Sequence, residues 1–121
     1  MANTFKVVTF AAEPNSAGTP YVVYTAGSGV TAVVLGLILT NINTAQVTAE
    51  VELVSDTGSR GGSNDVTNGT AFLAKDIPIP VGSSVELLAG NKVVLEATDQ
   101  LRIDCSVADK LSGALSIMEI T

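Results

Sequence analysis

Gln-Val-Thr-Ala-Glu-Val-Glu-Leu-Val, residues 46–54, alternates apolar and polar side chains over almost its whole length. Residues 100–107, Gln-Leu-Arg-Ile-Asp-Cys-Ser-Val, repeat this pattern. Because successive side chains of a strand point to opposite faces, both stretches predict strands with one buried and one solvated face, which is typical of antiparallel sheets. The residues predicted to face inward are Val47, Ala49, Val51, Leu53, Leu101, Ile103, Cys105 and Val107.

Two other segments are apolar on both faces. Residues 31–40 carry Val33, Leu35, Leu37 and Leu39 on one face and Val34, Gly36 and Ile38 on the other. Residues 114–121 carry Leu115 and Ile117 on one face and Met118 and Ile120 on the other. A strand of a two-layer sandwich needs only one apolar face, so a loop, another strand or another chain must cover the second. Cover from within the chain is slightly favoured for either strand alone, but two such strands make a subunit interface a serious candidate.

Clusters of Gly, Pro, Asn and Ser divide the chain into short segments, and no window has sustained helical periodicity. The predicted strands lie near residues 4–11, 20–26, 31–41, 46–54, 70–77, 83–89, 92–97, 100–107 and 113–120. We therefore expect residues 1–121 to form a single all-β domain, an antiparallel β-sandwich of about eight strands. A jelly-roll strand order is preferred, and an immunoglobulin-like order is the alternative.

One long irregular segment, residues 55–69, is rich in Gly, Ser, Asn and Asp. Structureless loops of this length are uncommon in compact domains unless they have a role. Its one basic residue is Arg60. We expect a flexible loop, which is either an arm that reaches a neighbouring subunit or a hairpin tip without a role; the arm is slightly favoured.

The composition argues against several classes of partner. Twelve acidic and six basic residues give a net charge of -6, which repels phosphate backbones, so we expect no direct nucleic-acid binding. The longest apolar run, residues 30–39, is too short to span a bilayer, and the N-terminus lacks the features of a signal peptide, so we expect no membrane association. A single cysteine cannot form an intramolecular disulfide, which favours folding in a reducing cytoplasm.

Few residues of this sequence could carry chemistry. The chain has no His, which is the usual general base and the commonest metal ligand. Cys105 lies on a predicted core face with no base to activate it, and Glu50 and Glu52 share a solvated face where they add solubility. The Asp and Asn residues of the 55–69 segment lack the spacing of a calcium loop. We expect no enzyme activity, no cofactor and no metal, and a structural or adhesive role.

Two stretches resemble a known family. One is Tyr-Thr-Ala-Gly-Ser-Gly-Val-Thr-Ala-Val-Val-Leu-Gly-Leu at residues 24–37, followed by Thr-Asn-Ile-Asn-Thr-Ala at 40–45. The other is Phe-Leu-Ala-Lys-Asp-Ile-Pro-Ile-Pro-Val-Gly-Ser-Ser-Val-Glu-Leu-Leu at 72–88, with Lys-Val-Val-Leu-Glu-Ala-Thr-Asp-Gln-Leu-Arg-Ile at 92–103. Together they resemble the small virion structural proteins of tailed bacteriophages, particularly marine and cyanobacterial phages. The resemblance covers roughly residues 20–120 in turn and core signatures, and residues 55–69 are an insertion relative to it.

This resemblance implies a β-sandwich that joins the virion after synthesis in the host cytoplasm. The favoured position is the capsid surface, as a cement or decoration protein that bridges major capsid subunits. A tail, neck or fibre-associated protein, or a receptor- or carbohydrate-binding module, is the alternative. The implied partners are the major capsid protein or other virion proteins, and further copies of the chain in a homo-oligomer. The predicted interface residues are Val34, Ile38, Met118 and Ile120, with Arg60 as the charged contact of the 55–69 loop.

Overall fold

The computed structural model describes residues 2–55, 69–88 and 92–121 of the 121-residue chain. The described part contains nine strands and no helix, so no helix in it is long and apolar enough to cross a membrane. The strands are β1 (Asn3–Phe10), β2 (Tyr21–Thr25), β3 (Thr31–Asn41), β4 (Val47–Val54), β5 (Thr70–Ile79), β6 (Ser84–Leu87), β7 (Val93–Leu95), β8 (Gln100–Cys105) and β9 (Leu111–Ile120). All nine strand positions predicted from the sequence are confirmed.

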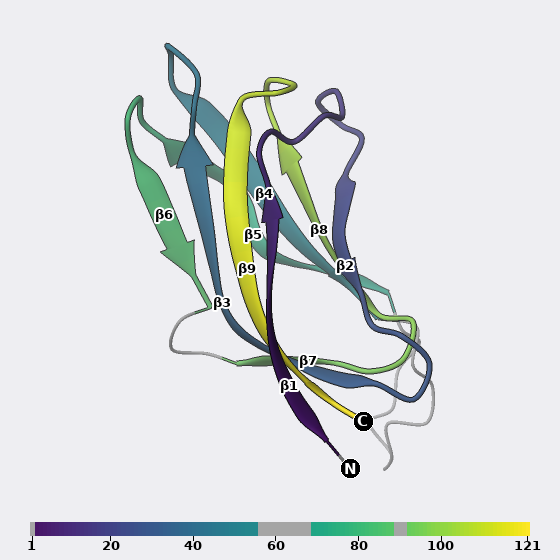
Figure 1. Cartoon of the computed structure of the whole chain (residues 1–121). Helices are drawn as coiled ribbons and strands as arrows, with labels where there is room; N and C mark the ends of the chain where they lie inside the picture. The colour runs from purple at the N-terminus through teal and green to yellow at the C-terminus, as the bar shows by residue number, and fades with distance from the viewer. Residues whose placement is uncertain (1, 56–68, 89–91) are drawn as a thin grey trace.

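The strands form two antiparallel sheets that pack face to face (Figure 1). Sheet A has the order β1-β9-β3-β6, and the short β7 also pairs with β3, along the same edge as β6. Sheet B has the order β2-β8-β4-β5. The predicted β-sandwich is confirmed.

The pairing follows one nested scheme from the chain ends toward the middle. β1 pairs with β9, β2 with β8, β3 with β6 and β7, and β4 with β5. The described strands therefore form one long hairpin whose innermost pair is β4–β5, rolled so that successive strand pairs alternate between the sheets. This is the jelly-roll order that the sequence analysis preferred, and it brings the two termini to the same end of the molecule (Figure 1).

The core lies between the sheets and consists of the inward residues of the alternating strands. The inward face predicted for β4 and β8 is confirmed: Val47, Ala49, Val51, Leu101, Ile103 and Cys105 are buried, and Leu53 packs against them. The prediction for Val107 is wrong. β8 ends at Cys105, so Val107 lies in the following turn and is exposed.

A β-bulge in β3 changes which residues face the core. The register with β9 shifts between Val34 and Gly36, so Leu35 is an extra residue without a partner. Because one inserted residue reverses the alternation, Val34 and Leu37 both face inward and are fully buried, whereas Ile38 faces outward. The prediction that Val34 and Ile38 share an interface face is therefore wrong for Val34.

Candidate docking surface

A row of apolar side chains crosses the outer face of sheet A. Phe5 of β1 is paired with Met118 of β9, Met118 with Val33 of β3, and Val33 with Val94 of β7. Directly opposed residues of neighbouring strands project to the same face. Phe5 is 72% exposed and Val94 is 53% exposed, so this face of the row lies at the molecular surface.

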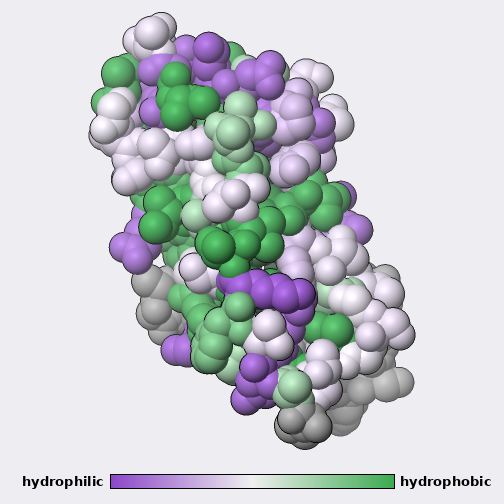
Figure 2. All heavy atoms as spheres, viewed as in Figure 1, coloured by the Kyte–Doolittle hydropathy of each residue, from purple (hydrophilic) through white to green (hydrophobic). Residues whose placement is uncertain are grey.

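The neighbouring outward positions of the three long strands extend this row. We call their set the apolar face: Asn3, Phe5, Val7, Thr9, Thr31, Val33, Gly36, Ile38, Thr40, Ser112, Ala114, Ser116, Met118 and Ile120. Seven of the fourteen residues have apolar side chains, one is a glycine and six are Asn, Ser or Thr. None of them carries a charge, although the chain has a net charge of -6. Figure 2 views sheet A from outside and shows apolar residues gathered across the middle of the molecule.

Ile38 lies between two hollows on the apolar face. A hollow of about 450 Å³ lies on one side of it, toward Thr9 and Ser112, and one of about 260 Å³ lies on the other, toward Gly36 and Glu86. Ile38 itself is 44% exposed. A half-exposed apolar side chain between two hollows is a surface into which a partner's side chains can pack.

Three of the five predicted interface residues lie on the apolar face: Ile38, Met118 and Ile120. Val34 belongs to the core, and Arg60 lies outside the described residues, as does most of the 55–69 loop. That the three residues form an interface stays a prediction.

Sequence reasoning missed the other apolar members of the row. Phe5, Val33 and Val94 come into one row only when β1, β9, β3 and β7 pair, and no local sequence pattern predicts that pairing. The alternation of residues 3–9 was visible in the sequence. However, the even-numbered positions of the same strand include the apolar residues Val8 and Phe10, so the pattern did not show which face of the strand points to solvent.

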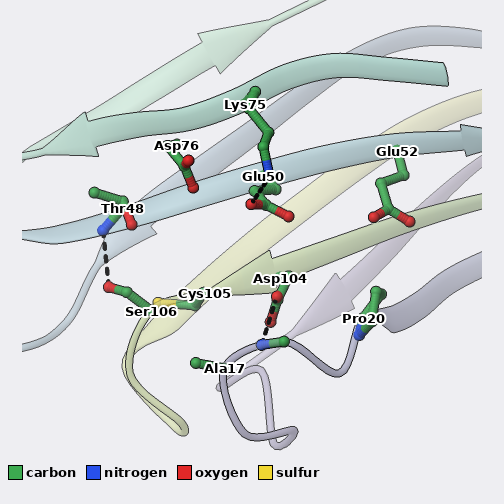
Figure 3. Close-up of a pocket in the computed structure, with 11 residues that line it drawn as sticks. Ala17, Pro20, Thr48, Glu50, Glu52, Lys75, Asp76, Asp104, Cys105 and Ser106 are labelled. Atoms are coloured by element: carbon green, nitrogen blue, oxygen red, sulfur yellow. Dashed lines mark hydrogen bonds and ion pairs between the residues drawn. The ribbon is translucent and has the colours of Figure 1, made fainter.

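The outer face of sheet B has a different character. A hollow of about 330 Å³ is lined by side chains of β4, β5 and β8 and by the segment between β1 and β2 (Figure 3). Lys75 Nζ donates to Glu50 Oε1 at 2.7 Å, the backbone N–H of Gly18 donates to Asp104 at 2.9 Å, and that of Thr48 donates to the Ser106 hydroxyl at 3.0 Å. These groups mainly bond to one another across the hollow.

The solvated position predicted for Glu52 is wrong, and both carboxylates predicted to solubilise this face take part in ion pairs. Besides the Glu50–Lys75 pair, Arg102 donates to Glu52 at 2.6 Å, and Glu52 is almost fully buried. Glu50 and Glu52 therefore tie the neighbouring strands of sheet B together.

Cys105 also lines this hollow, and it is buried as a member of the core. Burial raises the pKa of its thiol, which disfavours the nucleophilic thiolate at neutral pH. Within the described ranges, no group of three or more His, Cys, Asp and Glu side chains is arranged to hold a metal ion.

One buried carboxyl group was not anticipated. Glu13, between β1 and β2, is fully buried and accepts the backbone N–H of Asn15 at 3.0 Å. Its second oxygen and one oxygen of Asp104 are buried without a hydrogen-bond partner. Burial, followed by the nearby Asp104 charge, raises the pKa of Glu13 above its ordinary value.

No protein-family model and no curated protein matches the sequence. The fold is similar to a chain of the T13 viral particle of infectious bursal disease virus, with a TM-score of 0.54 and 13% identity over 97% of this chain and 30% of that chain. A chain of the Gx strain of the same virus gives a TM-score of 0.51 and 12% identity over 96% of this chain and 32% of that chain. This chain thus spans about a third of the viral chains, and at such low identity the similarity shows the fold alone.

A third solved structure is a Bacillus endospore appendage, from a family of disulfide-linked pili. It aligns with 99% of this chain and 87% of its own, at 16% identity and a TM-score of 0.46.

Proposed function

We propose that this chain is a non-enzymatic structural subunit of a virion and attaches to other virion proteins through the apolar face. The observation that carries the proposal is the absence of charge from every outward position of β1, β9 and β3 in a chain with a net charge of -6; Glu86 of β6, opposite Ile38, stands at the rim of this face. Contiguous exposed apolar surface marks protein–protein contact sites, and the core of such contacts is depleted in charged residues. Sheet B, by contrast, carries four acidic residues on its strands: Glu50, Glu52, Asp76 and Asp104.

Two further observations support this role. The jelly-roll order is common among viral capsid domains, and two of the solved structures with this fold are chains of a viral particle. The resemblance of residues 20–120 to small virion proteins of tailed bacteriophages favours the capsid surface as the location. There the chain would act as a cement or decoration protein that bridges major capsid subunits.

A cement protein stabilises a capsid by mass action. A protein that binds the assembled lattice, and not its separate subunits, shifts the equilibrium toward assembly. Binding at many equivalent sites by linked copies adds avidity without new kinds of contact. An acidic chain also avoids competition for the packaged nucleic acid.

The alternative of a tail- or fibre-borne carbohydrate-binding module needs a platform of exposed aromatic rings. Among the described residues, the exposed rings of Phe5 and Phe72 belong to sheets A and B respectively, so they do not form one platform. The structural subunit is therefore the function that this surface favours.

Attachment can be tested with a matched pair of variants. Ile38→Lys places a charge in the middle of the apolar face, opposite Glu86 on β6, where the new cross-strand pair helps to preserve the fold. Ile42→Lys changes a residue of similar exposure, 47% against 44%, beyond the end of β3. Virions of the encoding virus are banded by density, and the bound chain is quantified by mass spectrometry.

We expect wild type and Ile42→Lys to band with the particles and Ile38→Lys to remain at the top of the gradient. Absence of the wild-type chain from purified virions would refute the virion role. Binding of Ile38→Lys at the wild-type level would refute the use of the apolar face.

A further inference from the structure

Three of the four sheet edges have features that discourage pairing with another strand. On sheet A, the β6–β7 edge is split into strands of four and three residues. On sheet B, β2 is five residues long with a register shift, and β5 contains Pro78, Lys75 and two register shifts against β4. Short strands, proline, lysine and bulges are the devices by which proteins avoid edge-to-edge association.

The fourth edge, β1, lacks most of these devices. β1 has eight residues, no proline, and an unbroken register with β9 from Asn3 to Phe10. Its one lysine, Lys6, is held by an ion pair of 2.7 Å with Glu119 of the neighbouring strand. Among the described strands β1 pairs only with β9, so its other edge is open.

The register identifies the backbone groups on that open edge. Ala2 and Thr121 exchange both of their N–H···O bonds, so Ala2 and the even-numbered residues of β1 direct their backbone groups toward β9. The N–H and C=O groups of Asn3, Phe5, Val7 and Thr9 therefore point outward. The same four residues contribute the β1 side chains of the apolar face.

We propose that β1 pairs antiparallel with β1 of a second copy, about a two-fold axis at Phe5, so that the two A sheets become one continuous sheet. The proposal goes beyond the proposed function and names the surface through which the homo-oligomer expected from the sequence would form. A second copy fits because β1 is the open edge of every copy, and pairing of like with like closes both edges at once. The row Phe5–Met118–Val33–Val94 then continues into the partner subunit without interruption.

Charge selects the register. The outward backbone groups belong to the odd-numbered residues of β1, so each odd residue of one copy must pair with an odd residue of the other. Near the middle of β1, two-fold axes at Phe5, Lys6 or Val7 meet this condition. An axis at Lys6 would place two lysines opposite each other, which is unfavourable. An axis at Phe5 places Lys6 opposite the partner's Thr4. Because Thr4 is paired on its other side with Glu119, Lys6 of one copy and the partner's Glu119 lie in the same cross-strand row, with opposite charges.

An axis at Val7 offers Lys6 only an apolar neighbour, the partner's Val8, and leaves the Phe5 ring beside the partner's Thr9. An axis at Phe5 instead places the two Phe5 rings next to each other. Since Phe5 is the most exposed of the large apolar residues described, this register removes the most apolar surface from water.

Proline substitution tests the edge without breaking the β1–β9 ladder. Val7→Pro removes an N–H that faces the open edge and leaves every hydrogen bond to β9 in place. In multi-angle light scattering across a concentration series, we expect wild type at twice the 12.3 kDa chain mass and Val7→Pro at 12.3 kDa with a retained cooperative melting transition. Wild type that stays monomeric throughout the series, or folded Val7→Pro that stays dimeric, would overturn the proposal.

Disulfide trapping provides a second measurement that does not depend on proline. With the axis at Phe5, the two Phe5 Cα atoms lie about 5.5 Å apart, which a disulfide spans. Under mild oxidation Phe5→Cys should give a covalent dimer, whereas Val7→Cys should not, because the two positions would be separated by roughly 13 Å along the strands. The native Cys105 is buried and supplies the background control. Cross-linking of Val7→Cys in place of Phe5→Cys would overturn the proposed register.

The two proposals fail in different ways. A dimer that never bands with virions would refute the proposed function and leave the β1 contact intact. A monomer that does band with virions would refute the β1 contact alone. Ile38→Lys, which changes the face and not the edge, should stay dimeric while it loses attachment.

Discussion

The ring of Phe10 on β1 occupies the space that a side chain at Gly113 of β9 would need. The two residues are directly paired, and a Cβ atom at position 113 would lie 2.5 Å from Phe10 Cζ and 2.7 Å from the carbonyl oxygen of Ile38. The absence of a side chain at Gly113 is therefore what allows β1, β9 and β3 to close over this end of the core.

Gly113→Ala should lower the free energy of unfolding by about 1–3 kcal/mol, because the ring and the backbone must move apart. For a domain of this size the melting temperature should fall by roughly 5–15 °C. Gly36→Ala is the control, since a Cβ there meets nothing within 4 Å, and we expect a change within about 0.5 kcal/mol. Phe10→Leu should cost less in the Gly113→Ala background than in wild type; simple additivity in this double-mutant cycle would contradict the steric explanation.

Tyr24 of β2 donates a hydrogen bond to Glu119 of β9 and so links sheet B to sheet A. Tyr24→Phe removes the donor and should destabilise the chain by about 1–2 kcal/mol in urea unfolding at pH 7. Val22→Ala, a change at a more exposed residue of the same strand, is the comparison and should have the smaller effect. Equal effects would argue against a specific role for this hydrogen bond.

The hydrogen bond between Tyr24 and Glu119 also predicts how the stability of the chain changes at acid pH. Lys6, and then Tyr24, lower the pKa of Glu119 below its ordinary value of 4.5. A lowered folded-state pKa gives stability that is present above the unfolded-state value and is lost as the pH falls through the folded-state value. Part of the stability should therefore disappear below about pH 4.5, and Tyr24→Phe should reduce that part. If Tyr24→Phe lost as much stability below pH 4.5 as wild type does, this assignment would be contradicted.

The carboxyl group of Glu13 should affect the pH dependence of stability in the opposite direction to Glu119. Because its pKa is raised in the folded state, its charged form opposes folding at neutral pH, and this cost falls as the pH drops through the folded-state pKa toward 4.5. Glu13→Gln should therefore raise the melting temperature at pH 7 and lose this advantage in acid. Glu86→Gln, which removes an exposed carboxylate of β6, is the comparison and should leave the melting temperature at pH 7 nearly unchanged. A Glu13→Gln variant that is less stable than wild type at pH 7 would mean that the charge contributes to folding.

Two ion pairs on sheet B differ in burial and should differ in strength. Arg102→Met leaves Glu52, of which only 8% of the side chain is exposed, without its partner, and should cost about 2–3 kcal/mol. Lys75→Met breaks a pair whose lysine is 56% exposed and solvent-screened, so it should cost clearly less than Arg102→Met. Added salt should weaken the Glu50–Lys75 contribution and hardly affect the Arg102–Glu52 pair. Similar costs for the two variants would contradict burial as the deciding factor.

The local pattern of the sequence was sufficient to predict the strands. Alternation in residues 46–54 and 100–107 follows from the two-residue repeat of a strand, and turn residues separate the remaining segments, so all nine strands could be placed without tertiary information. The apolar outer face of β9 was also visible, because Met118 and Ile120 alternate with Leu115 and Ile117 across an unbroken strand.

Only the tertiary structure decided which side of each strand became the surface. The bulge at Leu35 reversed the alternation of β3 and moved Val34 into the core, and bulges depend on how two strands fit together rather than on either sequence alone. The apolar row joins Phe5 to Met118, more than a hundred positions away, and Glu13 became buried because its segment folds against the turn after β8. Strand formation is local, but register and neighbours come from long-range pairing, and the open edge of β1 is a consequence of that pairing.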